Sequence, residues 1–413
     1  MYSALLVIIF STNVYCATNN VCSTFKDYLT IKRNPNCWYD VAADQNATNI
    51  IKSNGYGVET HKVITPDGYI ITLFRIINRF GDGRKVPVLL NHGFLFSGAC
   101  FIGLGKKSLG FTLADAGYDV WLSNMRGTEY SAEHITLTAD DPKFWDFNID
   151  DIGFYDVPAQ LTYISQINWN NGKIIYIGHS LGGTVALTYA SALPQEARKF
   201  VKLFILLAPN GGFTHTNSII IRAGVSFMGI VDNFTNNGPQ TFLSTHGIAT
   251  QSAKAFCLQS PVFMKACIHF LNYIIMGPQK NIDASIAPIF FNHFPGGSSL
   301  KVMKQIVDSA RNGLRFYDYD LHNVELYGSL LPPAYNFSKI EVPVYIVYST
   351  SDSSTTEADS EKLYNRLSWQ AKRYGRYKIT VEDFNHSDFV YGRSAQTILY
   401  NQLLELMETI RQI

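Results

Sequence analysis

No uninterrupted apolar run in the 413 residues is long enough to span a bilayer, which takes about 20 residues. Charge is scarce as well, because only 16% of the residues are charged and the formal net charge is +1. This balance gives no electrostatic basis for binding nucleic acid or for broad adhesion to anionic membranes. Internal repeats are absent, and the apolar share of 46% is typical of an ordered globular protein. We therefore expect no nucleic-acid partner and no transmembrane segment, and any lipid partner must be reached through apolar surface.

The first residues have the features of a secretory leader. A short apolar stretch at residues 5–10 is followed by small residues near positions 16 and 17. This arrangement predicts a signal peptide over residues 1–17 and a protein that enters the secretory pathway, either secreted or lysosomal. Three glycosylation sequons agree with that compartment, with the acceptors Asn46, Asn233 and Asn336. A fourth match at Asn385 is expected to stay unmodified, because it adjoins a candidate active-site residue.

Cysteine is sparse, with six in the chain, and removal of the leader takes Cys16 and leaves an odd number. Two local bridges, Cys22 with Cys37 and Cys257 with Cys267, would be the simplest pairing and would leave Cys100 free. The sequence by itself leaves the connectivity open.

Short apolar and β-branched runs recur along the chain with helical stretches between them. Seven runs are predicted strands, at residues 69–77, 86–91, 118–124, 173–178, 201–208, 342–348 and 377–382. Several of these runs are apolar throughout rather than alternating, which is typical of strands covered on both faces. The pattern therefore predicts a mostly parallel sheet with helices on each side.

The alternation of strands and helices stops after residue 210 and resumes at residue 342. We therefore expect a core built from residues 18–210 and 342–413, with residues 211–341 inserted between two of its strands. The insertion is rich in Phe, Ile, Met and Tyr and predicts several helices with apolar faces, forming a cap over the carboxyl edge of the sheet. A movable lid is expected within residues 219–275, and a fixed cap packed into the core is the alternative.

The motif GHSLG at residues 178–182 has the pattern of a nucleophile elbow. Glycines flank the serine in such a motif because the strand-to-helix turn leaves no room beside it. A predicted strand precedes the motif and a predicted helix follows it. Ser180 is therefore the candidate nucleophile, and a structural serine in a tight turn is the alternative.

A serine hydroxyl needs a base to take its proton and a carboxylate to orient that base. In the α/β-hydrolase fold these groups follow the serine in the order acid, then histidine. His386 is the one histidine after the late strand at 342–348, and Asp352 follows the end of that strand. Glu357 and Asp359 lie within reach of the same loop and remain alternatives for the acid.

Attack on an ester builds negative charge on its carbonyl oxygen, which backbone N–H groups stabilise. The residue after the nucleophile supplies one donor, so we assign it to the N–H of Leu181. A loop after an early strand supplies the other, and His92-Gly93-Phe94 follows the strand at 86–91. We therefore assign the second donor to the N–H of Phe94.

With these residues in place, the chain resembles the acid lipase family, which contains the gastric and lysosomal lipases. The resemblance covers nearly the whole mature length and rests on TPDGY at 65–69, NHGFL at 91–95, DVWLSNMRG at 119–127, FW at 144–145, YDVPA at 155–159 and NHSDF at 385–389. It implies an α/β-hydrolase fold, a cap with a lid, and the same triad and oxyanion donors. It also implies a cap disulfide between Cys257 and Cys267.

The chain departs from the family pattern at three places. Leu181 stands where the family usually has glutamine, which leaves the backbone donor in place. The acid loop at 352–359 is longer than the usual spacing, and the extension at 22–46 with its two cysteines is not a family hallmark.

The leading hypothesis is a serine ester hydrolase that cleaves triacylglycerols or cholesteryl esters at a lipid–water interface through an acyl-enzyme, without a metal or organic cofactor. A catalytically inactive lipid-binding or storage protein on the same fold is the second hypothesis. A hydrolase of peptides or epoxides is the third, which the apolar cap and the serine at 180 disfavour.

Overall fold

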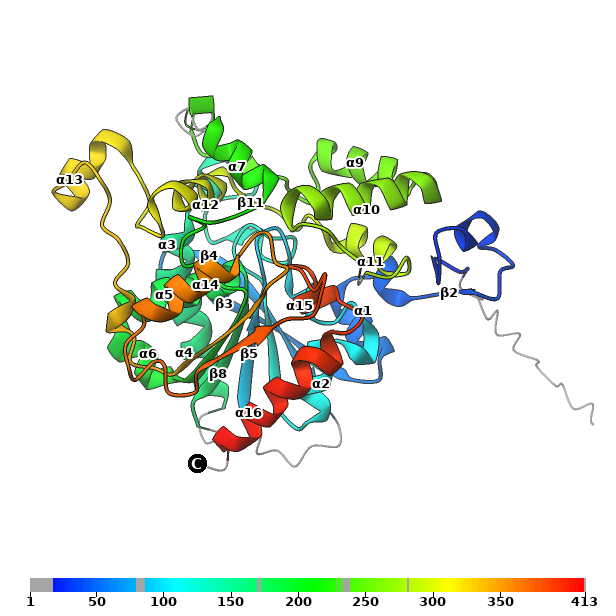
Figure 1. The fold of residues 1–413 in the computed structure, drawn as a ribbon, viewed down its shortest axis with the longest axis horizontal. Helices are drawn as coiled ribbons and strands as arrows, with labels where there is room; N and C mark the ends of the chain where they lie inside the picture. The colour runs from blue at the N-terminus through cyan, green and yellow to red at the C-terminus, as the bar shows by residue number, and fades with distance from the viewer. Residues whose placement is uncertain are drawn as a thin grey trace, which may run out of the picture.

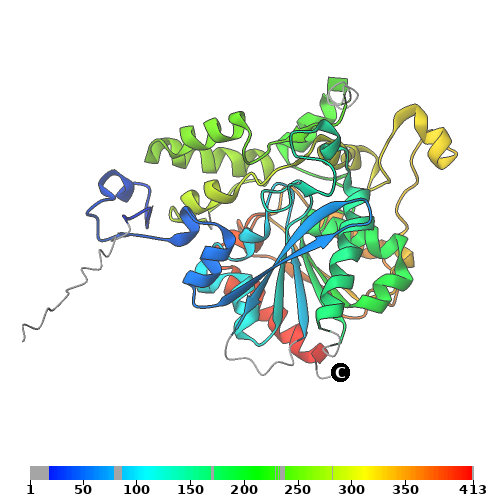
Figure 2. The same cartoon turned by 180° about the vertical axis from the view of Figure 1, so that it is seen from behind.

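A nine-stranded mixed sheet forms the centre of the molecule (Figures 1 and 2). The computed structural model describes residues 18–78, 86–168, 172–227, 229–230, 232, 238–280 and 282–411. The main path of the sheet runs in the order β13-β12-β9-β8-β5-β6-β4-β3, and β7 pairs with β4. Its strands are β3 (Gly57–Ile64), β4 (Tyr69–Ile77), β5 (Pro87–Asn91), β6 (Asp119–Ser123), β7 (Glu133–His134), β8 (Ile174–His179), β9 (Val201–Leu207), β12 (Val344–Ser349) and β13 (Arg376–Ile379).

The six strands from β13 to β6 pair in parallel, and the pairs β6–β4, β4–β3 and β4–β7 are antiparallel. The seven predicted strands correspond to β4, β5, β6, β8, β9, β12 and β13, so the α/β prediction is confirmed. Two strands of this sheet, β3 and the two-residue β7, were not predicted from the sequence. Of these, β3 is the longer. This edge strand carries the polar run Glu59 to Lys62 and is largely half-buried or exposed, so it has no continuous apolar signal.

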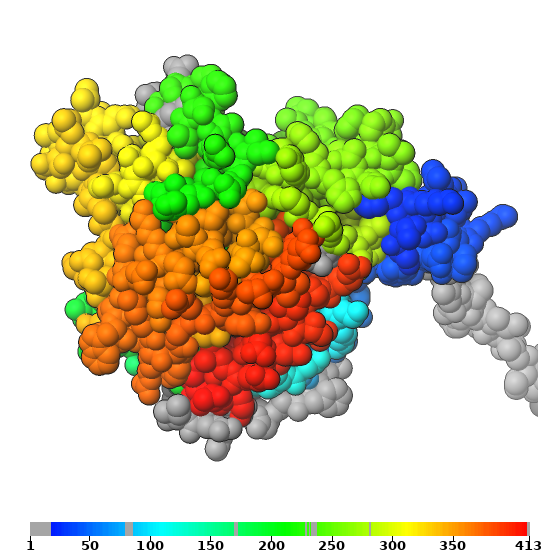
Figure 3. All heavy atoms as spheres, in the orientation of Figure 1, coloured from blue at the N-terminus to red at the C-terminus, as the bar shows by residue number. Residues whose placement is uncertain are grey.

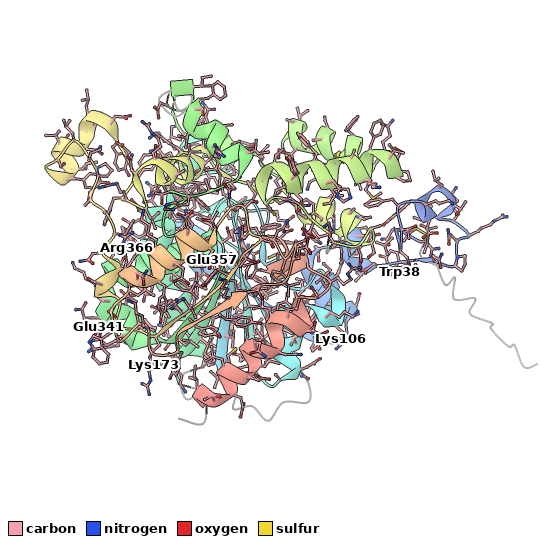
Figure 4. All side chains as sticks on the ribbon, viewed as in Figure 1. Trp38, Lys106, Lys173, Glu341, Glu357 and Arg366 are labelled. Atoms are coloured by element: carbon pink, nitrogen blue, oxygen red, sulfur yellow. A yellow bond between two sulfur atoms is a disulfide. The ribbon has the colours of Figure 1, made fainter. Side chains whose placement is uncertain are left out.

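Helices cover both faces of the sheet. Alternate residues of each strand point to opposite faces, so each face forms its own apolar core with the helices that cover it. Val88 and Leu90 of β5 lie in the same apolar core as α1 (Ala47–Ser53), α2 (Leu109–Asp115) and α16 (Asn401–Arg411). Leu89 belongs to a second core with α4 (Val157–Ile167), α5 (Leu181–Ala192), α6 (Pro194–Phe200) and α14 (Glu357–Arg366). Figure 4 labels Glu357 and Arg366, the two ends of α14. The central strands are therefore buried on both faces, as their continuous apolar runs predicted.

The insertion between β9 and β12 folds into a helical cap above the sheet (Figure 1). It contains α7 (Ile219–Ser226), α9 (Ile248–Leu258), α10 (Pro261–Ile275), α11 (Ile286–His293), α12 (Leu300–Asn312) and α13 (Asn323–Tyr327). A small ladder pairs β10 (Thr241–Phe242) with β11 (Ser298–Ser299). Within the part of the chain that the structure describes, no helix is both long and apolar enough to cross a membrane.

The N-terminal extension forms a small lobe beside the cap (Figures 1 and 3). Its strands β1 (Val21–Cys22) and β2 (Cys37–Trp38) are joined by the disulfide Cys22–Cys37, and Figure 4 shows Trp38 on this lobe. The structure also contains the disulfide Cys257–Cys267, which links α9 to α10, while Cys100 is a buried free thiol. The predicted signal peptide at residues 1–17 lies outside the described residues.

Candidate active site

Ser180 lies in the sharp turn between β8 and α5. Its φ of 52° is in the left-handed region that side-chain-bearing residues rarely adopt, and its N–H donates to Leu207 O at 2.9 Å. The flanking glycines are required by close packing. A Cβ at Gly182 would lie 2.2 Å from Asn91 O, and one at Gly178 would lie 2.5 Å from Gly182 O. The turn therefore needs its glycines, and it holds Ser180 in a strained backbone conformation at the carboxyl end of the sheet.

Asp352 and His386 come together from the loops after β12 and β13. Asp352 Oδ2 is 2.7 Å from His386 Nδ1, and both side chains are buried. The other carboxylate oxygen, Oδ1, accepts from the N–H groups of Ser354 at 2.8 Å and Thr355 at 3.0 Å. The carboxylate is thus fixed by backbone donors on one side, and it orients the imidazole from the other.

The two alternative acids are engaged elsewhere. Asp359 lies in the first turn of α14, where its carboxylate is 3.0 Å from both the backbone N and Nδ1 of His215. Glu357 is half-buried and forms an ion pair with Lys378. The geometry therefore favours Asp352 as the partner of His386.

The backbone of the early loop approaches the serine directly. A Cβ at Gly93 would lie 3.2 Å from the Cβ of Ser180, so the loop passes the nucleophile at close range. Leu181 is the first residue of α5, where N–H groups are free of intrahelical partners and the helix dipole favours negative charge. Phe94, Leu181, Ser180 and His386 all line one cavity.

Two further histidines, His179 and His92, support the site. No role was predicted for either ring from the sequence. The ring of His179 donates from Nε2 to the backbone carbonyl of His386 at 3.0 Å, and burial holds its pKa well below the usual value. Burial also lowers the pKa of His92 to about 4, so this ring accepts from Met125 N at Nε2 and donates from Nδ1 to Gly93 O. Both rings are therefore neutral and fix backbone next to the candidate triad. Their positions within the GHSLG and NHGFL motifs were the available sequence signal.

The cavity beside Ser180 has a volume of about 180 Å³ and mostly apolar walls. The sheet domain and the cap both contribute, with Phe94, Leu95, Phe96 and Leu181 from the first and Phe213, Ile220, Ile221, Phe242, Leu243, Leu271, Ile274, Ile275, Met276, Phe294, Met303 and Ile306 from the cap. The rings of Phe94 and Phe242 stack across the two parts at 5.9 Å. An apolar chain with one polar reactive group would match such a cavity.

Two of the predicted glycan acceptors, Asn46 and Asn336, are not among the residues that line this cavity. Asn46 and Asn336 are exposed, while Asn233 lies outside the described residues. Asn385 is buried, and its amide donates to Gly277 O and Pro278 O. Its burial agrees with the expectation that this sequon stays unmodified.

Known proteins share both the fold and the sequence pattern. Residues 86–392 match the family described as alpha/beta hydrolase fold, and residues 47–105 match the partial alpha/beta-hydrolase lipase region. A solved structure of monoglyceride lipase from Saccharomyces cerevisiae is similar with a TM-score of 0.51 at 16% identity, covering 86% of this chain and 98% of that one. At this identity the likeness concerns the fold.

Curated relatives found by sequence are more similar to this chain in sequence than that structure is. Lipase member K of Homo sapiens is 32% identical over 90% of this chain and 92% of its own length. Gastric triacylglycerol lipase of Bos taurus is 31% identical over 88% and 91%, and Lipase 1 of Drosophila melanogaster is 32% identical over 87% and 78%. The chain therefore belongs to the α/β-hydrolase fold family and, within it, to the lipases related to gastric lipase, which are carboxylic ester hydrolases.

Proposed function

We propose that Ser180 attacks the carbonyl carbon of a lipid ester, with His386 as general base and Asp352 as its orienting acid. The observation that carries this proposal is the hydrogen bond between Asp352 and His386 Nδ1 beside an apolar cavity lined by Ser180. That bond keeps the proton on Nδ1 and leaves Nε2 unprotonated, so that Nε2 can accept the serine proton.

The reaction then follows the acyl-enzyme course. As the serine oxygen adds to the ester, the N–H groups of Phe94 and Leu181 stabilise the negative carbonyl oxygen. His386 passes its proton to the leaving alcohol, and the acyl group stays on Ser180. A water molecule, deprotonated by His386, attacks the acyl carbon and releases the fatty acid.

The substrates that fit this cavity best are triacylglycerols and cholesteryl esters. Its walls are apolar on the sheet side and on the cap side, so a fatty acyl chain is desolvated on entry. The name of the bovine relative, gastric triacylglycerol lipase, supports the same substrate class. Peptide substrates would leave many backbone polar groups without partners in such a cavity.

The cap offers a surface for the lipid. Ile248 is 87% exposed and Val262 is 72% exposed, and further large apolar side chains are exposed on the same helices, namely Phe256, Leu258, Phe263, Phe270 and Tyr273. Exposed apolar surface of this extent marks an interaction site. We place a movable lid within residues 219–275, whose apolar side is stabilised in the open position only at a lipid–water interface.

The secretory pathway is the proposed destination, with secretion or delivery to the lysosome as its end. The two disulfides form in an oxidising compartment. The exposed sequons at Asn46 and Asn336 are the proposed glycan sites that the structure describes, and Asn233 is the third.

The test is hydrolysis of trioleoylglycerol and cholesteryl oleate emulsions across acid and neutral pH, with Ser180→Ala as the matched inactive variant. We expect fatty acid release by the wild type alone, rising sharply as trioleoylglycerol passes from dispersed to emulsified. Release by Ser180→Ala at the wild-type rate would refute the assignment of the nucleophile. Binding of both emulsions without release would support the inactive lipid-binding alternative.

A further inference from the structure

The loop that carries His386 is held from the cap side by buried polar groups. Ser387, the next residue, is fully buried, and its hydroxyl lies 3.0 Å from the side-chain oxygen of Asn272 on α10. Asn272 is itself only 2% exposed, and its amide nitrogen donates to Ile268 O at 2.8 Å, one turn back in the helix. A cap side chain is thus hydrogen-bonded to the residue that follows the candidate base.

The hydroxyl of Ser387 has a second acceptor within reach, the side-chain oxygen of Asn385 at 3.0 Å. A hydroxyl has one proton to donate. Asn385 Oδ1 already accepts from the backbone N–H of Ser387 and from the amide of Gln279, each at 3.1 Å. The arrangement that satisfies every one of these buried groups therefore directs the hydroxyl proton to Asn272.

Residues 276–280, which follow α10 and are called the strap here, contact both catalytic loops together with the end of the helix. Ser354, two residues after Asp352, donates its hydroxyl to Ile275 O at 2.7 Å, and Ser353 N donates to Met276 O at 3.3 Å. On the histidine side, Asn385 donates to Pro278 O at 2.9 Å. The carboxyl end of α10 thus contacts the loops of Asp352 and His386 at the same time.

The outer side of α10 is braced as well. The disulfide Cys257–Cys267 ties it to α9, and Phe25 of the N-terminal lobe packs near His269 with the ring centroids 6.2 Å apart. Tyr28 of the same lobe donates to Ala284 O just beyond the strap. The end of α10 that faces the catalytic loops is therefore anchored by several contacts at once.

We propose that Asn272 is a positioning residue for His386, and that the carboxyl end of α10 is held against the catalytic loops. Through Ser387 it holds the histidine loop where the imidazole meets Asp352. The lid proposed above would then end at this anchored turn. This inference rests on the proposed function, because it assigns Asn272 a role through the general base.

The experiment compares Asn272→Ala with Asn168→Ala on p-nitrophenyl butyrate, a soluble ester that needs no interface. Asn168 is the matched control, because it is also buried and its amide makes the same bond to the carbonyl four residues back, Ile164 O at 3.3 Å, while its Oδ1 accepts from Arg75 and not from a residue of the site. Activities are normalised to the folded fraction. We expect Asn272→Ala to lower kcat about 10- to 100-fold with KM little changed, because a displacement of about 1 Å costs that much, and Asn168→Ala to keep the wild-type kcat.

The pH profile separates positioning from general loosening. The Asp352 carboxylate favours the imidazolium that forms during the reaction, so a weaker bond to His386 changes the pH dependence of kcat/KM, whereas loosening elsewhere leaves it unchanged. The acid limb of kcat/KM should therefore move in Asn272→Ala and stay in place in Asn168→Ala. Ser387→Ala should show the same shift of the acid limb. The double variant Asn272→Ala/Ser387→Ala should lose no more kcat than the less active of the two single variants.

Unchanged kcat and an unmoved acid limb in Asn272→Ala would overturn the inference, as would additive losses in the double variant. Should Asn272→Ala fail to fold, Ser387→Ala decides, and a wild-type profile there overturns the inference too. Failure of the proposed function looks different, because the wild type would then be inactive or Ser180→Ala would be active.

Discussion

Replacement of Asp352 by Asn changes the acid by one atom and leaves its size almost unaltered. In the wild type, Oδ1 accepts from Ser354 N and Thr355 N, and Oδ2 faces His386 Nδ1 at 2.7 Å. The asparagine oxygen would take over the two backbone bonds, because only it can accept them. The amide nitrogen would then face Nδ1, which places two donors against each other.

The imidazole can relieve this conflict by moving its proton to Nε2, the nitrogen that must accept from Ser180. A base in the wrong tautomer costs about 10⁴-fold in kcat in the comparable triad. This factor corresponds to about 5 kcal/mol of transition-state stabilisation, at roughly 1.36 kcal/mol for each factor of ten. We therefore expect Asp352→Asn to lose about four orders of magnitude in kcat while KM changes little.

The assay is steady-state hydrolysis of p-nitrophenyl butyrate, with thermal unfolding as the check on folding. Asp359→Asn is the control, because the Asp359 carboxylate contacts His215 and Thr356, the N-cap residue of α14, rather than His386. It should lose some thermal stability and keep kcat near the wild-type value. A larger loss in Asp359→Asn than in Asp352→Asn would refute the reasoning and move the triad acid to position 359.

Three more outcomes follow from the same structure. Burial raises the pKa of Asp151 to about 6, so the folded state binds a proton that the unfolded chain has lost. The free energy of unfolding should therefore fall by roughly 2–3 kcal/mol between about pH 4 and pH 6 because of this group, and Asp151→Asn should remove that part of the slope in denaturant titrations. Gly182→Ala would place a Cβ 2.2 Å from Asn91 O, so it should fold poorly or unfold at a much lower temperature in a melting experiment. Ser180→Ala and His386→Ala should each lose about as much kcat as the double variant, and additive losses would show that the two do not act together.

The strands could be predicted from the sequence, and candidate site residues could be proposed from it, because both have local signals. The strand β4 was predicted with the bounds Tyr69–Ile77 that the structure shows, since its apolar run is long. The elbow at Ser180 was readable because only glycine tolerates the close contacts on either side. The choice of His386 followed from the order of groups along the chain in this fold.

The remaining features depend on packing between distant segments, which leaves no local pattern. The edge strand β3 has mixed polarity, so nothing distinguished it from a loop. The choice between Asp352 and Asp359 needed the position of His386 in space. The contact of Asn272 with Ser387 joins residues 115 positions apart, and no periodicity in the sequence could indicate it.

The central claim, an acyl-enzyme on Ser180, is tested most directly by rapid mixing with p-nitrophenyl butyrate followed by acid quench and mass spectrometry of peptides. The account predicts a burst of about one p-nitrophenol per enzyme where deacylation is the slower step, and a butyryl group on the peptide that contains Ser180. It also predicts neither signal in Ser180→Ala. Turnover by the wild type with the acyl group on another residue, or an undiminished burst in Ser180→Ala, would contradict the account.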